Sequence, residues 1–141
     1  MVVREQRYGG LVACGYLVDT FCLGVKNTIG PKSVEPDRLR EFVASYFRAF
    51  DRPPFAVPLE LAQYLVLGAV EFARGLGFEP HPDFARVREY LGAAPAGPNP
   101  ITFGQDGMPY FISGPNDDAY AVMNTLRRTV GDGKFDYLMP A

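Results

Sequence analysis

Residues 2–18 read Val-Val-Arg-Glu-Gln-Arg-Tyr-Gly-Gly-Leu-Val-Ala-Cys-Gly-Tyr-Leu-Val, two β-forming runs separated by a pair of glycines. Two adjacent glycines can adopt the positive φ angles of a tight turn, and the second run is apolar on both faces, as a central strand is. The stretch therefore predicts a β-hairpin with a two-residue turn at Gly9 and Gly10. Gly15, inside the second run, predicts a β-bulge or the close approach of another element.

Four later segments carry apolar residues at the three-and-four spacing of an amphipathic helix. They cover residues 36–50, 58–76, 82–91 and 119–130. Ser33 is a candidate cap for the first helix, Pro36 suits its first turn, and we expect its aromatic stripe to be buried. Gly68 interrupts the second helix and predicts a closely packed helix or strand beside it, because glycine destabilises a helix by about 1 kcal/mol relative to alanine.

The remaining segments are shorter and rich in glycine. Residues 19–31 indicate a structured connector, and residues 101–112 predict a second hairpin that turns at 104–107. The Gly, Ala and Pro composition of residues 92–100 is typical of a connector, whereas residues 134–138 are suited either to a terminal strand or to a segment that covers an apolar patch. The sequence thus predicts a single α+β domain over residues 1–141, in which two antiparallel β-hairpins pack with about four α-helices, a single layer of sheet covered by helices.

Composition limits the class of protein. Hydrophobic residues make up 48% of the 141 residues, which is enough for one sizeable core, and the formal net charge is −2. This acidic balance disfavours nucleic acid as a partner. No apolar run is long enough to cross a bilayer, the first residues do not resemble a signal peptide, and only two cysteines occur, so we expect a cytoplasmic protein without membrane association.

The first candidate site combines the single histidine with nearby carboxylates. His81 and Asp83 lie in Pro-His-Pro-Asp, and Glu71 and the pair Asp117 and Asp118 are further carboxylates that folding could bring close. Imidazole and carboxylates can hold a divalent metal, for which His81, Asp83, Asp117 and Asp118 are the candidate ligands, or act as acid and base. The structural alternative is that His81 bonds a backbone carbonyl while the three aspartates stabilise helix starts. No metal-binding spacing such as H-E-x-x-H favours the first interpretation.

The second candidate site is Asp19, Cys22 and Lys26, because a cation near a thiol lowers the thiol pKa and raises its reactivity. No histidine partner is apparent in the sequence. The apolar neighbours of Cys22 support the alternative that it is a small core residue and that Asp19 caps the connector.

Three stretches together resemble a bacterial domain family of unassigned function. They are Leu17–Lys26 (LVDTFCLGVK), Gly68–Phe84 (GAVEFARGLGFEPHPDF) and Gly114–Asp118 (GPNDD). The resemblance implies no catalytic residues and no activity. It does imply that these stretches are more than scaffold.

Three functions are compatible with the sequence. The first is a non-enzymatic interaction or regulatory domain that binds a protein partner or itself, because phosphate-loop, dinucleotide and nucleophile-elbow motifs are absent. The alternative is a metal-dependent hydrolase or nuclease that uses His81 with nearby carboxylates to activate water on a divalent ion. A third is a small-molecule pocket between helices and sheet, with tyrosines in its wall at positions 16, 46, 64 and 110.

Overall fold

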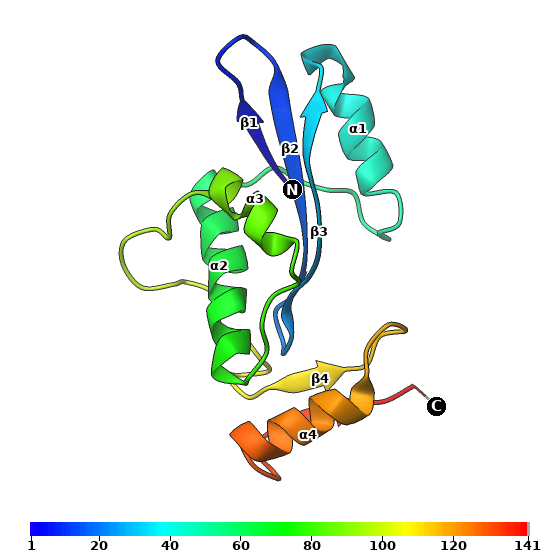
Figure 1. Cartoon of the computed structure of the whole chain (residues 1–141), viewed down its shortest axis with the longest axis vertical. Coiled ribbons are helices and arrows are strands. Elements are labelled where there is room, and N and C mark those ends of the chain that lie inside the picture. Colours follow the sequence, from blue (N-terminus) through cyan, green and yellow to red (C-terminus); the bar gives the residue numbers. More distant parts are fainter. Residues whose placement is uncertain (141) are drawn as a thin grey trace.

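The N-terminal half is built on an antiparallel sheet of three strands in the order β1 (Val2–Glu5), β2 (Leu11–Asp19) and β3 (Gly24–Val34). The computed structural model describes residues 1–140, and the sheet runs along its long axis (Figure 1). The predicted first hairpin is confirmed, but its two-residue turn is wrong. The chain leaves the sheet at Gln6, whose N–H donates to the Gly10 carbonyl over 2.7 Å, and of the two glycines only Gly9 has a positive φ, of 87°.

The prediction that residues 19–31 form a connector rather than a strand is wrong, because most of this segment belongs to β3. Breaks in its pattern reflect two irregularities in the pairing of β3 with β2. At one, Gly30 and Pro31 stand opposite Cys14 alone, and at the other Lys26 is the extra residue. Bulges and a proline are tolerated on an edge strand, which is where β3 lies, so the apolar alternation that identifies a strand is lost there.

One face of the sheet packs against α2 (Leu59–Gly75) and α3 (Phe84–Leu91) and forms the first core. Alternate residues of β2 point into this core, and the prediction that this run is a central strand is confirmed by the strand order β1-β2-β3. The core contains Val2, Val12, Cys14, Tyr16, Val25, Val66, Leu67, Val70, Phe84, Val87 and Leu91. Positive φ angles at Gly77 and Gly92, 94° and 86°, let the chain leave these helices where the sequence predicts.

The opposite face of the sheet is covered only in part, by α1 (Leu39–Tyr46) and the 3-10 turn Pro36–Arg38 before it. The Tyr46 ring lies directly over Gly15, a residue without a side chain to keep it away. The expected buried stripe is wrong, since no residue of α1 is buried and the helix ends four residues before Phe50. Ser33 lies in β3 and does not cap the helix.

The C-terminal part pairs β4 (Tyr110–Ile112) in parallel with β5 (Asp136–Leu138), with α4 (Ala119–Thr129) between them in the chain. The predicted turn at 104–107 is confirmed by an isolated antiparallel bridge between Gln105 and Met108, but the two flanking strands do not pair as a hairpin. Residues 101–103 form no strand, because Phe103 stacks with Phe72 and covers Gly68 on α2. The second core lies between α4, β4 and the end of α2, and comprises Cys22, Leu76, Phe111, Met123, Leu126 and Phe135.

The connector over residues 92–100 lies along α2. The Tyr64 hydroxyl donates to the Ala96 carbonyl over 3.0 Å, and the Asn99 amide donates to the Tyr64 carbonyl over 2.9 Å. The close neighbour predicted for Gly68 is confirmed, but Asn99 and Phe103 belong to a loop and not to a helix or strand. None of the helices in residues 1–140 has the length and apolar character needed to span a bilayer.

Candidate functional site

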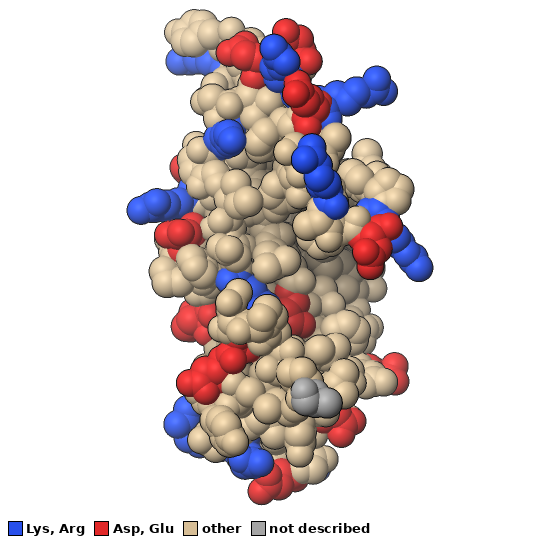
Figure 2. All heavy atoms as spheres, turned by 90° about the vertical axis from the view of Figure 1, so that its right-hand side faces the viewer, with Lys and Arg blue, Asp and Glu red and all other residues tan. Residues whose placement is uncertain are grey.

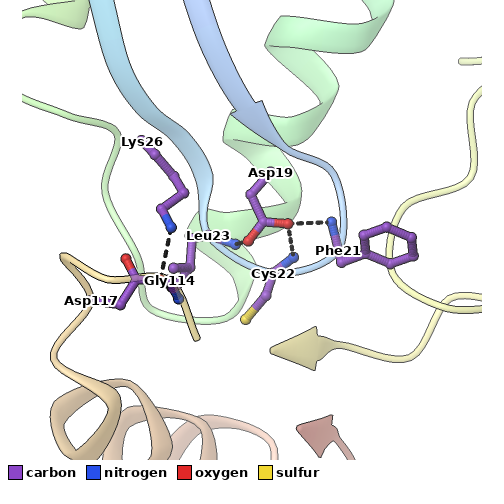
Figure 3. Close-up of polar contacts among 7 residues, drawn as sticks. All are labelled: Asp19, Phe21, Cys22, Leu23, Lys26, Gly114 and Asp117. Carbon is purple, nitrogen blue, oxygen red and sulfur yellow. Dashed lines mark hydrogen bonds and ion pairs between the residues drawn. The ribbon is translucent and has the colours of Figure 1, made fainter. Parts of the chain in front are cut away.

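The three stretches quoted above for their resemblance meet at the turn between β2 and β3 (Figure 3). At Gly24, φ is 69° and an added Cβ would lie 2.8 Å from the Ala73 Cβ of α2, so only glycine allows this approach. The His81 N–H, from the segment after α2, donates to the Val25 carbonyl over 2.9 Å. Lys26 reaches Asp117, 91 residues away in the chain.

Asp19 organises the turn itself. One of its carboxylate oxygens accepts the backbone N–H of Phe21 over 2.8 Å and of Cys22 over 3.3 Å, and the other accepts that of Leu23 over 2.9 Å (Figure 3). The prediction that Asp19 caps this segment is confirmed. These three donors occupy the carboxylate with local structure, as in a helix N-cap.

Cys22 is fully buried, with an exposed fraction of 0%. Desolvation, followed by the nearby carboxylates Asp19 and Asp117, raises its pKa to about 12, and the Lys26 charge offsets this only in part. The thiol is therefore protonated at neutral pH, whereas a reactive cysteine needs a lowered pKa and access to solvent. Its neighbours in the second core give it the packing contacts of a small apolar residue.

Lys26 forms an ion pair with Asp117 in which Nζ and Oδ2 are 2.8 Å apart. The same oxygen accepts the Gly114 N–H over 2.8 Å. Burial raises the pKa of Asp117, but the hydrogen bonds from Lys26 and Gly114 and the Lys26 charge outweigh it, and the pKa of this carboxyl lies below its ordinary value. Because Lys26 is the extra residue of a β-bulge, its side chain is directed away from the regular ladder and toward the loop before α4.

His81 and Asp83 form a local turn at the start of α3. The Asp83 N–H donates to His81 Nδ1 over 3.1 Å, and an Asp83 carboxylate oxygen lies 4.0 Å from the same nitrogen. The prediction that the imidazole bonds a backbone carbonyl is thus wrong, since its nitrogen accepts from a backbone N–H. Asp83 precedes α3 without a side-chain capping bond, whereas Asp118 caps α4 by accepting the Ala121 N–H over 3.0 Å.

The candidate metal ligands are not gathered into one site. Within residues 1–140, no three His, Cys, Asp or Glu side chains lie close enough together to hold a metal ion. Glu71 is on the exposed side of α2. Asp117 accepts the Gly114 N–H and pairs with Lys26, and Asp118 caps α4.

The four tyrosines proposed for a pocket wall also lie apart. Tyr16 faces the first core and donates to the Val87 carbonyl over 2.7 Å, whereas Tyr46 lies on the opposite face of the sheet. Tyr64 binds the 92–100 connector and Tyr110 packs edge-on against Phe21. No shared pocket results from this arrangement.

The sequence did not reveal an exposed apolar cluster beside the end of α1. Tyr46 on Gly15 leads to Phe47 and then Phe50, with ring centroids 4.8 and 5.8 Å apart. Ile29 pairs with Gly15, and Leu17 is the next residue of β2 on that face. We call Leu17, Ile29, Phe47 and Phe50 the α1 patch. The sequence signal of this patch is an aromatic stripe that continues past the end of the helix, and the prediction that the stripe is buried is wrong.

Comparison with protein-family models, with curated proteins and with solved structures found no match. No activity is therefore transferred to this chain from a relative. What it does has to follow from its own surface and its own polar groups.

Proposed function

We propose that this chain is a non-enzymatic domain that binds a protein partner through the α1 patch. The observation that carries the proposal is the exposure of large apolar side chains on the face of the sheet that α1 covers only in part. Leu17 in β2, Ile29 in β3 and Phe50 after α1 are 47%, 49% and 54% exposed. Contiguous apolar surface rimmed by polar groups is typical of interaction sites.

The surroundings of the patch support this proposal. Figure 2 faces the α1 side of the molecule, where tan surface predominates and charged side chains of both signs are scattered over it. An apolar centre with a charged rim is the usual anatomy of a protein interface. Aromatic rings in such a centre contribute most of the binding energy, because they bury a large area at a small entropic cost.

The polar groups give no comparable support to an enzyme. Asp19, Cys22, Lys26 and Asp117 each have partners within the fold that account for their positions. An active site needs groups with pKa values suited to proton transfer or nucleophilic attack, gathered around a cavity. The buried thiol of Cys22 has the opposite property, a raised pKa.

The proposal is tested by photo-crosslinking in cells that express the natural protein. A photoreactive phenylalanine analogue at position 50 should give one discrete crosslinked product, which Leu17→Ser in the same chain should diminish. The matched control places the analogue at Tyr120, which is 83% exposed on α4, away from the patch. Equal products from both positions would contradict the proposal, as would hydrolase or nuclease turnover that His81→Ala abolishes in a folded protein.

A further inference from the structure

We infer that α1 belongs to a flap, residues 35–58, which can leave the sheet and unfold while the rest of the molecule stays folded. The flap comprises the 3-10 turn, α1 and the loop that leads to α2. Its docking then controls the α1 patch, a consequence that rests on the proposed function, whereas the opening itself does not. Four features of the structure carry the inference.

The first feature is the lack of buried side chains. Between Val34 and Val66 no side chain is buried, whereas α2, α3 and α4 each have at least two buried residues. Most of the stability of a helix in a protein comes from the packing of its apolar face, and the 8 residues of α1 are too few for a stable helix alone in water. We therefore expect α1 to unfold when it leaves the sheet.

The second feature is a groove on each side of the helix. On the β3 side, a groove of about 380 Å³ is lined by Val34 of the strand and Phe42 of the helix. On the β1 side, a groove of about 550 Å³ is lined by Val3 and Leu11 of the sheet and Leu39 of the helix. Both grooves are open to solvent, so undocking of α1 exposes less new apolar surface than separation of a closely packed helix would.

The third feature is how few contacts fix α1 to the sheet. Within residues 1–140, no hydrogen bond or ion pair joins residues 35–57 to the rest of the chain. The Tyr46 ring lies over Gly15, and the Lys32 ammonium group lies 5.2 Å from the centre of the Phe42 ring. A cation–π contact at an exposed site is weak. Tyr46 is therefore the residue whose removal should release the flap.

The fourth feature is the freedom of the two ends of the flap. Glu35 alone separates β3 from the 3-10 turn, and residues 47–58 separate α1 from α2. Every side chain of residues 48–58 is exposed. A loop of this length spans up to about 40 Å when it is extended, so α1 can move away from the sheet without disturbing α2.

Opening of the flap takes the α1 patch apart. Leu17 and Ile29 lie on the sheet, whereas Phe47 and Phe50 belong to the flap. The two pairs separate when α1 leaves the sheet. A partner that binds the complete patch therefore stabilises the docked state, because it has no equal affinity for the open one.

Hydrogen exchange of the full chain, followed by mass spectrometry across a urea series, tests the flap. In the wild type the α1 amides should be protected at least about a hundredfold less than the central amides of α2, and their exchange should depend little on urea, because a local opening exposes little surface. Tyr46→Ala should abolish the protection of α1. The α2 amides should then lose no more than the factor by which α1 was protected, because the flap cannot add more to global stability than its opening costs. Phe55→Ala is the matched control, because this side chain is 85% exposed in the same segment and its loss should change neither helix.

Exchange of α1 with the protection and the urea dependence of α2 would mean that both helices open in one global step, and the flap would be overturned. A Tyr46→Ala variant in which α1 stays protected would also overturn it. The crosslink from position 50 reports on the patch separately and should weaken in Tyr46→Ala. Its persistence while α1 is unprotected would overturn the control of the patch by docking. A wild type without any crosslink contradicts the proposed function, whereas the exchange data decide the flap without a partner.

Discussion

Replacing Lys26 by methionine should destabilise the protein more than neutralising its partner Asp117 does. The two charges are 2.8 Å apart, and the exposed fractions of their side chains are 27% for Lys26 and 9% for Asp117. At this distance the Coulomb energy is about 6 kcal/mol for an effective dielectric constant of 20 and about 1.5 kcal/mol in bulk water. The net value is smaller, because the folded state has already lost hydration of both groups.

The expected loss follows from the unequal burial of the two groups. Exposed pairs contribute about 0.2–1 kcal/mol, and removing one partner of a buried pair costs about 3–5 kcal/mol. Lys26→Met leaves a nearly buried carboxylate with only the Gly114 N–H, so we expect a loss of about 2 kcal/mol. Asp117→Asn keeps an acceptor for Gly114 and leaves an ammonium group that can reach water, so about 1 kcal/mol is lost. The double variant should be more stable than Lys26→Met alone.

The pH dependence gives a second, independent test of the same pair. In the wild type the pKa of Asp117 is lowered by folding, so the stabilisation is fully present above the unfolded pKa of about 4 and is lost as pH falls through the folded pKa. In Lys26→Met, burial without a cation disfavours the charged carboxylate, and protonation at low pH relieves this penalty. The difference in stability between the two proteins should therefore begin to narrow above pH 4, where Asp117 of the variant becomes protonated, and should keep narrowing until the pH falls below the lowered pKa of Asp117 in the wild type.

Urea denaturation at neutral and acidic pH measures these differences, and thermal unfolding at neutral pH should show a decrease of roughly 5–8 °C for Lys26→Met. The wild type and the Asp117→Asn variant serve as references at each pH. An equal loss at both pH values, or a larger loss for Asp117→Asn than for Lys26→Met, would refute the assignment of the destabilisation to an unpaired buried carboxylate.

Three further changes follow from close packing and burial. Gly15→Ala places a Cβ 2.6 Å from Cζ of the Tyr46 ring and should destabilise by about 1–3 kcal/mol in urea denaturation, and most of this loss should disappear in a Tyr46→Ala background. Gly68→Ala meets the Phe103 ring at 2.6 Å and should destabilise similarly, whereas Gly75→Ala in the same helix meets nothing within 4 Å and should stabilise by about 0.5–1 kcal/mol. Cys22, fully buried and with a pKa of about 12, should resist iodoacetamide in the native protein and react at the rate of global unfolding, and rapid modification of the folded chain would show an accessible thiolate.

The sequence predicts helices α2, α3 and α4 well, because each boundary depends on neighbours in the chain. Prolines or a capping aspartate precede these helices, and glycines with positive φ follow them. The strands were harder to predict. β3 is obscured by its two bulges, and the parallel pairing of β4 with β5 joins residues 26 positions apart, so neither leaves a regular local pattern.

In the candidate site, too, contacts between neighbours in the chain could be predicted from the sequence and contacts between distant residues could not. Asp19 and Asp118 bind backbone groups within four residues, and both caps could be predicted from side-chain chemistry alone. The partner of Lys26 could not be predicted from the sequence, because the β-bulge sets the direction of the lysine and the turn at Gly114 sets the position of Asp117. The α1 patch was missed for another reason. Apolar periodicity shows which residues share a face, and it does not show whether another element covers that face.

Variants of the Lys26–Asp117 pair and variants of the α1 patch should therefore have different effects in experiment. Val25 belongs to the first core and Cys22, three residues earlier, to the second, so the turn that Asp19 and Lys26 hold joins two packed regions. Loss of the Lys26–Asp117 pair weakens the connection between the two cores, whereas the patch lies on the other face of β2, at the end of α1. Lys26→Met should thus lower stability and leave partner binding by the folded protein unchanged, whereas Phe50→Ser should weaken partner binding and leave stability unchanged. If either variant had both effects, the patch would depend on this connection, and the division between scaffold and binding surface would be incorrect.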